Sequence, residues 1–117
     1  MAEMKPGRTG NEVLKAALGV MKSEGIDGSI YTHPIGDHGH GAGPLIGLWD
    51  RQEGVPHRGE VKLRANTWYA IELQATSEVA EWDGQKVRAA LEEDAVLNGD
   101  GEMEWVLGWQ ERFHLVR

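Results

Sequence analysis

The sequence predicts an α+β domain in which one long amphipathic helix lies on a curved, mostly antiparallel sheet. Three observations support this fold class. Apolar residues recur at helical spacing near the N-terminus, two long segments later in the chain alternate in polarity, and Gly-containing turns follow those segments. A chain of 117 residues has the size of one domain, so we expect residues 1–117 to form a single domain.

The predicted helix runs from about Gly10 to Glu24. Thr9 and Glu12 have the spacing of a capping box, in which each side chain bonds the backbone N–H of the other residue. The apolar residues that follow form one buried stripe. They are Val13, Leu14, Ala17, Leu18 and Met21. Gly25 suits the left-handed conformation that commonly follows a helix.

Short strands are predicted at Ser29–Thr32 and Leu45–Trp49 from their apolar character. The Gly- and His-rich segment His33–Pro44 between them is predicted to be a loop. Arg51–Lys62 contains Gly and Pro and reads as an exposed connection.

Two longer strands are predicted at Thr67–Ala75 and Lys86–Leu97, with turns at Asp83-Gly84 and Asn98–Gly101. Alternation places Glu72 on the face shared by Trp68, Ala70 and Gln74. Short apolar pieces follow at Trp105–Trp109 and Phe113–Val116. One helix covers only one face of such a sheet, so the other face is expected to bind a partner or enclose a site.

The composition narrows the classes of function. The formal charge is −7 and no basic run is visible, which argues against a nucleic-acid partner. The chain has no Cys, which excludes disulfides and thiolate metal sites. Neither an apolar signal segment in Met1–Gly10 nor a membrane-length apolar stretch is visible, so we expect no membrane association and a cytoplasmic location.

The segment His33–Pro44 is the first candidate for chemistry. It holds three His and four Gly within twelve residues. Imidazole is the commonest side-chain metal ligand, and Gly lets a ligand approach closely. The alternative is a flexible polar loop with a fortuitous His cluster.

Acidic residues within the long predicted strands are the second candidate. Glu72 interrupts an apolar strand, where a buried carboxylate is costly unless it is paired or metal-bound. Glu92-Glu93-Asp94 interrupts the next strand. The alternatives are a solvent-facing Glu72 and a charged turn or short helix at 92–94. Together, one His and two Glu give a mixed nitrogen and oxygen ligand set that suits divalent metals.

The order of these motifs resembles a known superfamily. Gly39-His40-Gly41-Ala42-Gly43 is similar to the Gly-His-Gly-x-Gly metal motif of the creatinase, aminopeptidase P and methionine aminopeptidase superfamily. Ala70-Ile71-Glu72-Leu73 is similar to its Thr-Ile-Glu-Pro strand, and Glu92-Glu93-Asp94 to its final Glu strand. The stretch Thr32–Asp50 most resembles bacterial Xaa-Pro aminopeptidase-like proteins.

The resemblance implies the C-terminal half of a pita-bread fold and metal-dependent hydrolysis of an N-terminal peptide bond. It implies His40, Glu72 and Glu92 as metal ligands, with His38 as the alternative imidazole ligand because the register of the His segment is ambiguous. His33 would line the substrate site, and His33 and His38 are the implied catalytic residues. The implied cofactor is Mn, Co or Zn, with up to two ions in a completed site.

The sequence departs from the family pattern in three places. Leu73 replaces the Pro after the strand Glu, and Trp49-Asp50 occupies the region of an expected second His. The two Asp ligands of the family belong to a preceding half-domain, and the Asp residues of this chain lie elsewhere. The expected partners are therefore a peptide substrate and either a second copy of the chain or a complementary N-terminal half. The alternative is a catalytically inactive metal- or protein-binding module.

Overall fold

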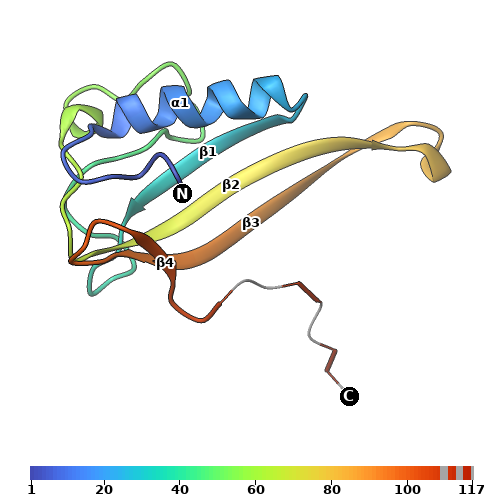
Figure 1. The fold of residues 1–117 in the computed structure, drawn as a ribbon. Helices are drawn as coiled ribbons and strands as arrows, with labels where there is room; N and C mark the ends of the chain where they lie inside the picture. Colours follow the sequence, from blue (N-terminus) through green and yellow to red (C-terminus); the bar gives the residue numbers. More distant parts are fainter. Residues whose placement is uncertain (109–110, 113–114, 117) are drawn as a thin grey trace.

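The computed structural model describes residues 1–108, 111–112 and 115–116. Within these residues the element order is α1 (Gly10–Ser23), β1 (Asp27–Pro34), the 3-10 helix η1 (Arg58–Glu60), β2 (Thr67–Val79), the 3-10 helix η2 (Ala80–Trp82), β3 (Gln85–Leu97) and β4 (Met103–Trp105). The strands form an antiparallel sheet in the order β1-β2-β3-β4 (Figure 1). The structure confirms an α+β fold in which, among the described residues, one α-helix accompanies a four-stranded antiparallel sheet.

The capping box at the start of α1 is confirmed. The Thr9 backbone N–H donates to the Glu12 carboxylate at 2.7 Å, and the Glu12 backbone N–H donates to the Thr9 hydroxyl at 3.2 Å. The helix ends at Ser23, one residue before the predicted end, and Gly25 adopts a φ of 69° as expected for the residue that follows a helix. The local signals therefore determine where the helix begins and ends.

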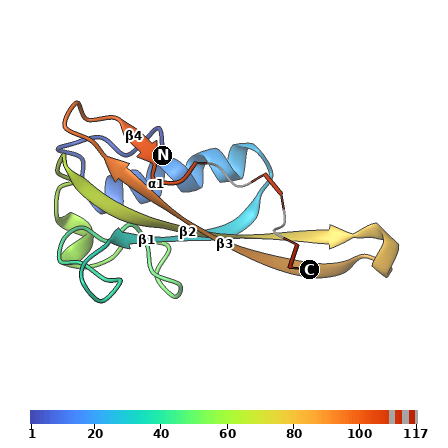
Figure 2. The same cartoon turned by 90° about the horizontal axis from the view of Figure 1, so that it is seen from below.

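The core lies between α1 and one face of the sheet (Figure 2). Leu14 of α1 packs in the same buried cluster as Tyr69 and Ile71 of β2 and Leu97 of β3. Met4 and Leu63, from the segments that precede α1 and β2, also belong to this cluster. We call this side of the sheet the helix-covered face.

Strand β1 is longer than the predicted Ser29–Thr32, because it begins at Asp27 and also includes His33 and Pro34. His33 and Pro34 pair with β2, with His33 opposite Ala70. The predicted strand at Leu45–Trp49 is wrong, since only isolated bridges form there, Thr32 with Ile46 and Leu48 with Arg51. Gly47 adopts a φ of 74°, which interrupts the extended backbone that a strand needs.

The connection at Arg51–Lys62 is less exposed than predicted. Val55 and Gly59 are buried in it. The Asn11 side chain of α1 accepts the Val55 N–H at 2.8 Å and donates to the Val55 carbonyl at 3.2 Å. These two bonds fasten the connection to the helix.

Strands β2 and β3 form a long hairpin paired from Thr67 opposite Leu97 to Val79 opposite Gln85. The predicted turn at Asp83-Gly84 is confirmed, and both residues have positive φ, 53° and 76°. Because β1 pairs with β2 only as far as Thr76, the tip of the hairpin projects beyond the helix and β1 (Figures 1 and 2). Residues 92–94 belong to β3, so the alternative of a charged turn or helix there is wrong.

The C-terminal turn at 98–101 is confirmed, and β4 follows it. The predicted apolar pieces Trp105–Trp109 and Phe113–Val116 include positions 109, 113 and 114, which lie outside the described residues. In the described part of the chain, no helix has the length and apolar character needed to cross a membrane.

Candidate functional site

The second face of the sheet carries the predicted site residues. Tyr31, Glu72 and Glu92 are direct cross-strand partners on β1, β2 and β3, so their side chains point to the same side. Ile71, the neighbour of Glu72, points to the helix-covered face and is buried. His33 lies two residues after Tyr31 and therefore shares its side. We call the side with Tyr31, His33, Glu72 and Glu92 the open face.

The closest polar contact on this face joins His33 and Glu72. His33 Nε2 lies 2.8 Å from Glu72 Oε1. The His33 side chain is 4% exposed and that of Glu72 is 29% exposed. The contact is therefore partly shielded from water, so any attraction or repulsion between the two groups is stronger than in an exposed pair.

A second contact determines which nitrogen of His33 carries the hydrogen. Nδ1 lies 3.0 Å from the Pro34 backbone oxygen. A carbonyl can only accept, so Nδ1 is the donor. In the neutral ring, Nε2 then presents its lone pair to the Glu72 carboxylate. Two acceptors at this distance repel each other unless a proton or another cation lies between them.

His40 reaches the same place from the loop after β1, which lies on the other side of the sheet from α1 (Figure 2). Its ring stacks on that of His33, with 4.3 Å between centroids and 17° between planes. The Tyr31 ring lies 5.1 Å from His33 at 43°. His40, His33 and Tyr31 therefore form a row of rings beside Glu72.

Glycines make the tight loop around His40 possible. The Gly41 N–H donates to the Pro34 carbonyl at 2.6 Å. A Cβ on Gly41 would lie 2.8 Å from the Ile35 oxygen, and one on Gly36 would lie 2.9 Å from the His40 oxygen. Any side chain at these positions would push the loop away from β1. The Gly-rich composition therefore serves to bring His40 over His33.

The two carboxylates line an open pocket of about 390 Å³. Its lining residues are Tyr31, Trp49, Glu72, Leu73, Gln74, Ala90, Leu91 and Glu92. His33 and His40 are not among them, so they lie beside this pocket rather than in its wall. Burial, and secondarily the Glu72 charge, raises the pKa of the Tyr31 phenol, which keeps it neutral and able to donate a hydrogen bond.

The structure thus brings three of the five predicted site residues together: His33, His40 and Glu72. Glu92 shares their face and the pocket, directly across the strand from Glu72. His38 is exposed and makes no hydrogen bond or ring contact within the described part of the chain. In the part that the structure describes, no three His, Asp or Glu side chains are already gathered around one point.

Two aromatic residues of the site were not predicted as functional. Tyr31 was assigned to a strand, and Trp49 was assigned to a short apolar segment, where with Asp50 it occupies the region of an expected second His. Trp49 is 74% exposed although it lines the pocket.

Comparison of the chain with models of protein families, with curated proteins and with solved structures finds no match.

Proposed function

We propose that the open face supplies the His/Glu/Glu half of a divalent metal site in a metallopeptidase of the Xaa-Pro aminopeptidase type. The fold proposed with it is the C-terminal half of a pita-bread domain, in which a helix lies on a curved antiparallel sheet. The proposal combines the motif resemblance with the geometry of His33 and Glu72. Its substrate class is a peptide with a free N-terminus.

The single observation that carries the proposal is the contact between His33 Nε2 and Glu72. The Pro34 carbonyl accepts a hydrogen bond from Nδ1, so Nε2 is the ring nitrogen that faces the carboxylate and is available to a cation. Metal-binding His residues commonly donate their other N–H to a backbone carbonyl in this way. The donor set therefore fits a divalent cation, and a cation there would relieve the repulsion of the two acceptors.

This geometry changes the roles that the motif resemblance implied. His33, which is buried and in contact with Glu72, is the better imidazole ligand in the proposed site. His40 lies on the outer side of the His33 ring and is better placed to meet a substrate. Glu72 and Glu92 remain the proposed carboxylate ligands, and His38 becomes the weakest of the three imidazole candidates.

The bound metal would polarise the peptide carbonyl and activate water for its hydrolysis. The chain's own residues contribute position and charge. His33 is fixed by its Nδ1–H bond to Pro34, and Tyr31 offers a neutral phenol at the edge of the pocket. Trp49 provides an apolar wall for a substrate side chain.

The two Asp ligands of the family are to be supplied by another chain or domain in this proposal. No residue lining the pocket is an Asp. This observation also favours a second candidate function, in which the chain binds a metal or a protein partner without peptidase activity. Metal affinity tests both functions, and peptide hydrolysis separates them.

The first experiment is calorimetric titration of the metal-free chain with Mn²⁺, Co²⁺ or Zn²⁺. We expect binding that His33→Ala and Glu72→Ala each weaken by about tenfold or more. Glu78→Ala is the matched control, because Glu78 lies on the same strand and face but near the projecting tip. Equal affinity in all four proteins would contradict the metal site.

The second experiment measures metal-dependent hydrolysis of an Xaa-Pro-containing tripeptide. If His40 contacts substrate rather than metal, His40→Gln lowers turnover while leaving metal affinity close to that of the unchanged protein. If His40 is instead a ligand, affinity and turnover fall together. Metal binding with no turnover in any variant would favour the inactive binding module.

A further inference from the structure

The outer edge of β3 is largely unpaired. Strand β4 joins it only at Ala95–Leu97, and the Val106 N–H donates to the Asp94 carbonyl at 3.0 Å. Among the residues that the structure describes, no strand pairs with this edge between Gln85 and Glu93. A long, exposed edge of this kind is a ready template for another strand.

The hydrogen bond from Val106 to the Asp94 carbonyl shows which backbone N–H and C=O groups of β3 point away from β2. In an antiparallel strand, the N–H and C=O of one residue point to the same side, and alternate residues share that direction. The Asp94 carbonyl points outward, so the outward-pointing residues are the even-numbered ones. They are Lys86, Arg88, Ala90 and Glu92, and all four are exposed.

The charges along this edge are complementary to themselves. Lys86 and Arg88 precede Ala90, whereas Glu92 and Asp94 follow it at the same spacings. We propose that the β3 edge pairs antiparallel with the β3 edge of a second copy of this chain, about a two-fold axis at Ala90. In that register Arg88 lies opposite the partner's Glu92 and Lys86 lies opposite the partner's Asp94.

The register agrees with the hydrogen-bonding pattern. Arg88, Ala90 and Glu92 each meet an outward-pointing residue of the second copy, so each pair exchanges two backbone hydrogen bonds. Backbone hydrogen bonding between the two copies stops before Asp94, whose carbonyl already accepts from Val106, so Lys86 and the partner's Asp94 meet only through their side chains. If the two strands slip by two residues in one direction, Arg88 lies opposite the partner's alanine. If they slip by two in the other direction, Lys86 lies opposite the partner's valine. Either slip loses one of the two kinds of ion pair.

Both faces of the sheet gain from the pairing. On the open face, the partner's Arg88 approaches Glu92, which otherwise lies directly opposite the like charge of Glu72. On the helix-covered side, Leu91 is 60% exposed, and in Figure 1 its strand β3 is separated from α1 by β1 and β2. The register places Leu91 opposite the partner's Ala89, where its apolar surface is covered. The interface goes beyond the proposed function and does not require a metal.

Charge reversal tests the register. Sedimentation equilibrium in metal-free buffer should give a dimer at micromolar concentration, and Arg88→Glu should raise its dissociation constant by about tenfold or more, because each new Glu faces the partner's Glu92. Within its own chain Arg88 lies opposite Thr76, so the fold has no ion pair to lose there. The double variant R88E/E92R should restore the dimer.

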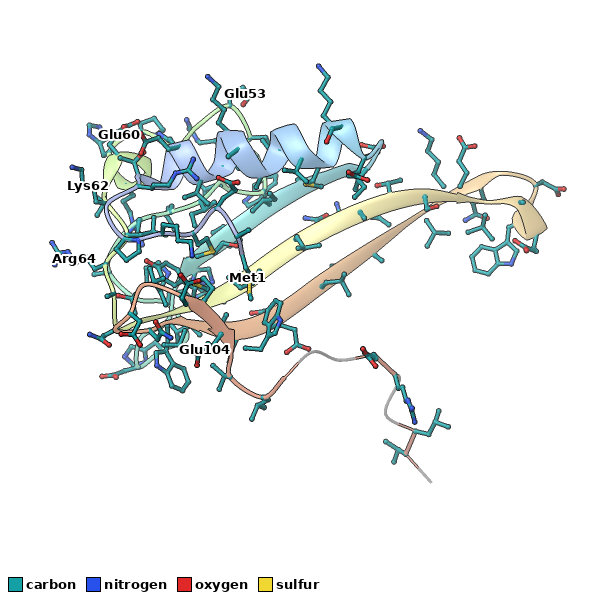
Figure 3. All side chains as sticks on the ribbon, in the orientation of Figure 1. Met1, Glu53, Glu60, Lys62, Arg64 and Glu104 are labelled. Atoms are coloured by element: carbon teal, nitrogen blue, oxygen red, sulfur yellow. The ribbon has the colours of Figure 1, made fainter. Side chains whose placement is uncertain are left out.

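Arg64→Glu is the matched control, since it changes the net charge equally. Figure 3 shows Arg64 at the end of the molecule opposite to the projecting hairpin tip, away from the β3 edge. We expect this variant to dimerise like the unchanged chain. A monomeric unchanged chain would overturn the proposal, as would a double variant that stays as weak as Arg88→Glu.

Crosslinking tests the axis independently of charge. The chain has no Cys, so Ala90→Cys introduces one thiol per copy. At the proposed axis the two thiols face each other and should form an intermolecular disulfide under mild oxidation. Ala89→Cys is the control. Residue 89 lies directly opposite the partner's Leu91, so the two introduced thiols would be diagonal neighbours and not direct cross-strand partners. Equal crosslinking of both variants, or none with Ala90→Cys, would overturn the register.

Discussion

The two faces of the sheet are made from alternate residues of the same strands, yet they differ in burial and in charge. On the helix-covered face, Tyr69 and Ile71 are 0% and 8% exposed and contact a continuous apolar cluster. On the open face, the intervening Glu72 contacts His33 and lies opposite Glu92. A shift of one residue along β2 thus separates a packed core from a polar pocket.

The helix-covered face accounts for the stability of the fold, and the open face carries its candidate chemistry. The helix-covered face removes apolar surface from water, and among the described residues it buries the Tyr69 hydroxyl without a hydrogen-bond partner. The open face holds two carboxylates directly opposite each other and an imidazole nitrogen 2.8 Å from one of them, an arrangement that costs free energy unless a proton or a metal cation lies there. We therefore expect substitutions on the two faces to have effects of different size and even of different sign.

The largest effect is expected from Leu14→Ala in the buried cluster. Leu14 is 1% exposed, so truncation removes packed methyl groups and leaves a cavity under the sheet. We expect the free energy of unfolding to fall by about 2–5 kcal/mol in urea denaturation. Val20→Ala on the same helix is the control, because Val20 is exposed. Similar losses for the two variants would mean that α1 does not pack as described.

A smaller effect is expected at alkaline pH from the Tyr69 phenol. Burial raises the pKa of Tyr69 to about 12, from the ordinary value of 10.0. Between these pH values the unfolded chain has lost a proton that the folded chain keeps, so the free energy of unfolding falls as pH rises. The loss is on the order of 2 kcal/mol.

Tyr69→Phe should remove most of that dependence in denaturation curves recorded on either side of pH 10. Tyr31→Phe is the internal control, since Tyr31 is the only other Tyr in the chain and lies on the open face. If Tyr31→Phe flattened the pH profile more than Tyr69→Phe, the assignment of the buried face would be wrong.

Removing the helix cap is expected to have a more modest effect. Thr9→Ala removes the hydroxyl that accepts the Glu12 N–H and should lower the free energy of unfolding by about 1 kcal/mol. The Thr9 backbone N–H, which donates to the carboxylate, holds the pKa of Glu12 below its usual 4.5. The contribution of Glu12 is therefore present above that pH and is lost as the pH falls through the lowered pKa.

Thermal denaturation of Thr9→Ala beside Ser23→Ala measures the cap. Ser23 lies at the other end of α1, and its hydroxyl donates only to the Val20 carbonyl of its own helix. An equal loss in the two variants would show that the capping box contributes nothing special to the helix-covered face.

The smallest effect, and the one with the opposite sign, is expected on the open face. Glu92→Gln removes a like charge from the position opposite Glu72, so the metal-free monomer should become more stable by a few tenths of a kcal/mol, about 0.2–0.5. Glu93→Gln is the control, because Glu93 lies opposite Ile71 instead. With saturating Mn²⁺ the sign should reverse for Glu92→Gln, since the variant loses a proposed ligand.

Much of the fold could be predicted because its signals are local. Thr9, Glu12 and Gly25 mark the ends of α1, and Asp83-Gly84 marks the hairpin turn. The strand at Leu45–Trp49 was predicted wrongly because apolar character outweighed Gly47, whose positive φ interrupts the strand. The inclusion of His33 in β1 could not be read locally, because it depends on pairing with Ala70.

The site was predictable to the extent that it follows strand alternation. Alternation placed Glu72 on the face of Trp68, Ala70 and Gln74, and the hairpin register, which pairs Glu72 with Glu92, brings Glu92 to the same face. The contact between His33 and Glu72 joins residues 39 positions apart and arises from the pairing of β1 with β2. No spacing within the His-rich segment could distinguish His33 from His38 or His40 as the imidazole nearest the carboxylate.

The projecting β2–β3 hairpin also affects how the molecule moves through solvent. The radius of gyration is 15.2 Å, whereas a globular chain of this length is expected to have about 13 Å. Such a shape experiences more friction than a sphere of the same 12.9 kDa mass, so a monomer would leave a gel-filtration column early and could pass for a dimer.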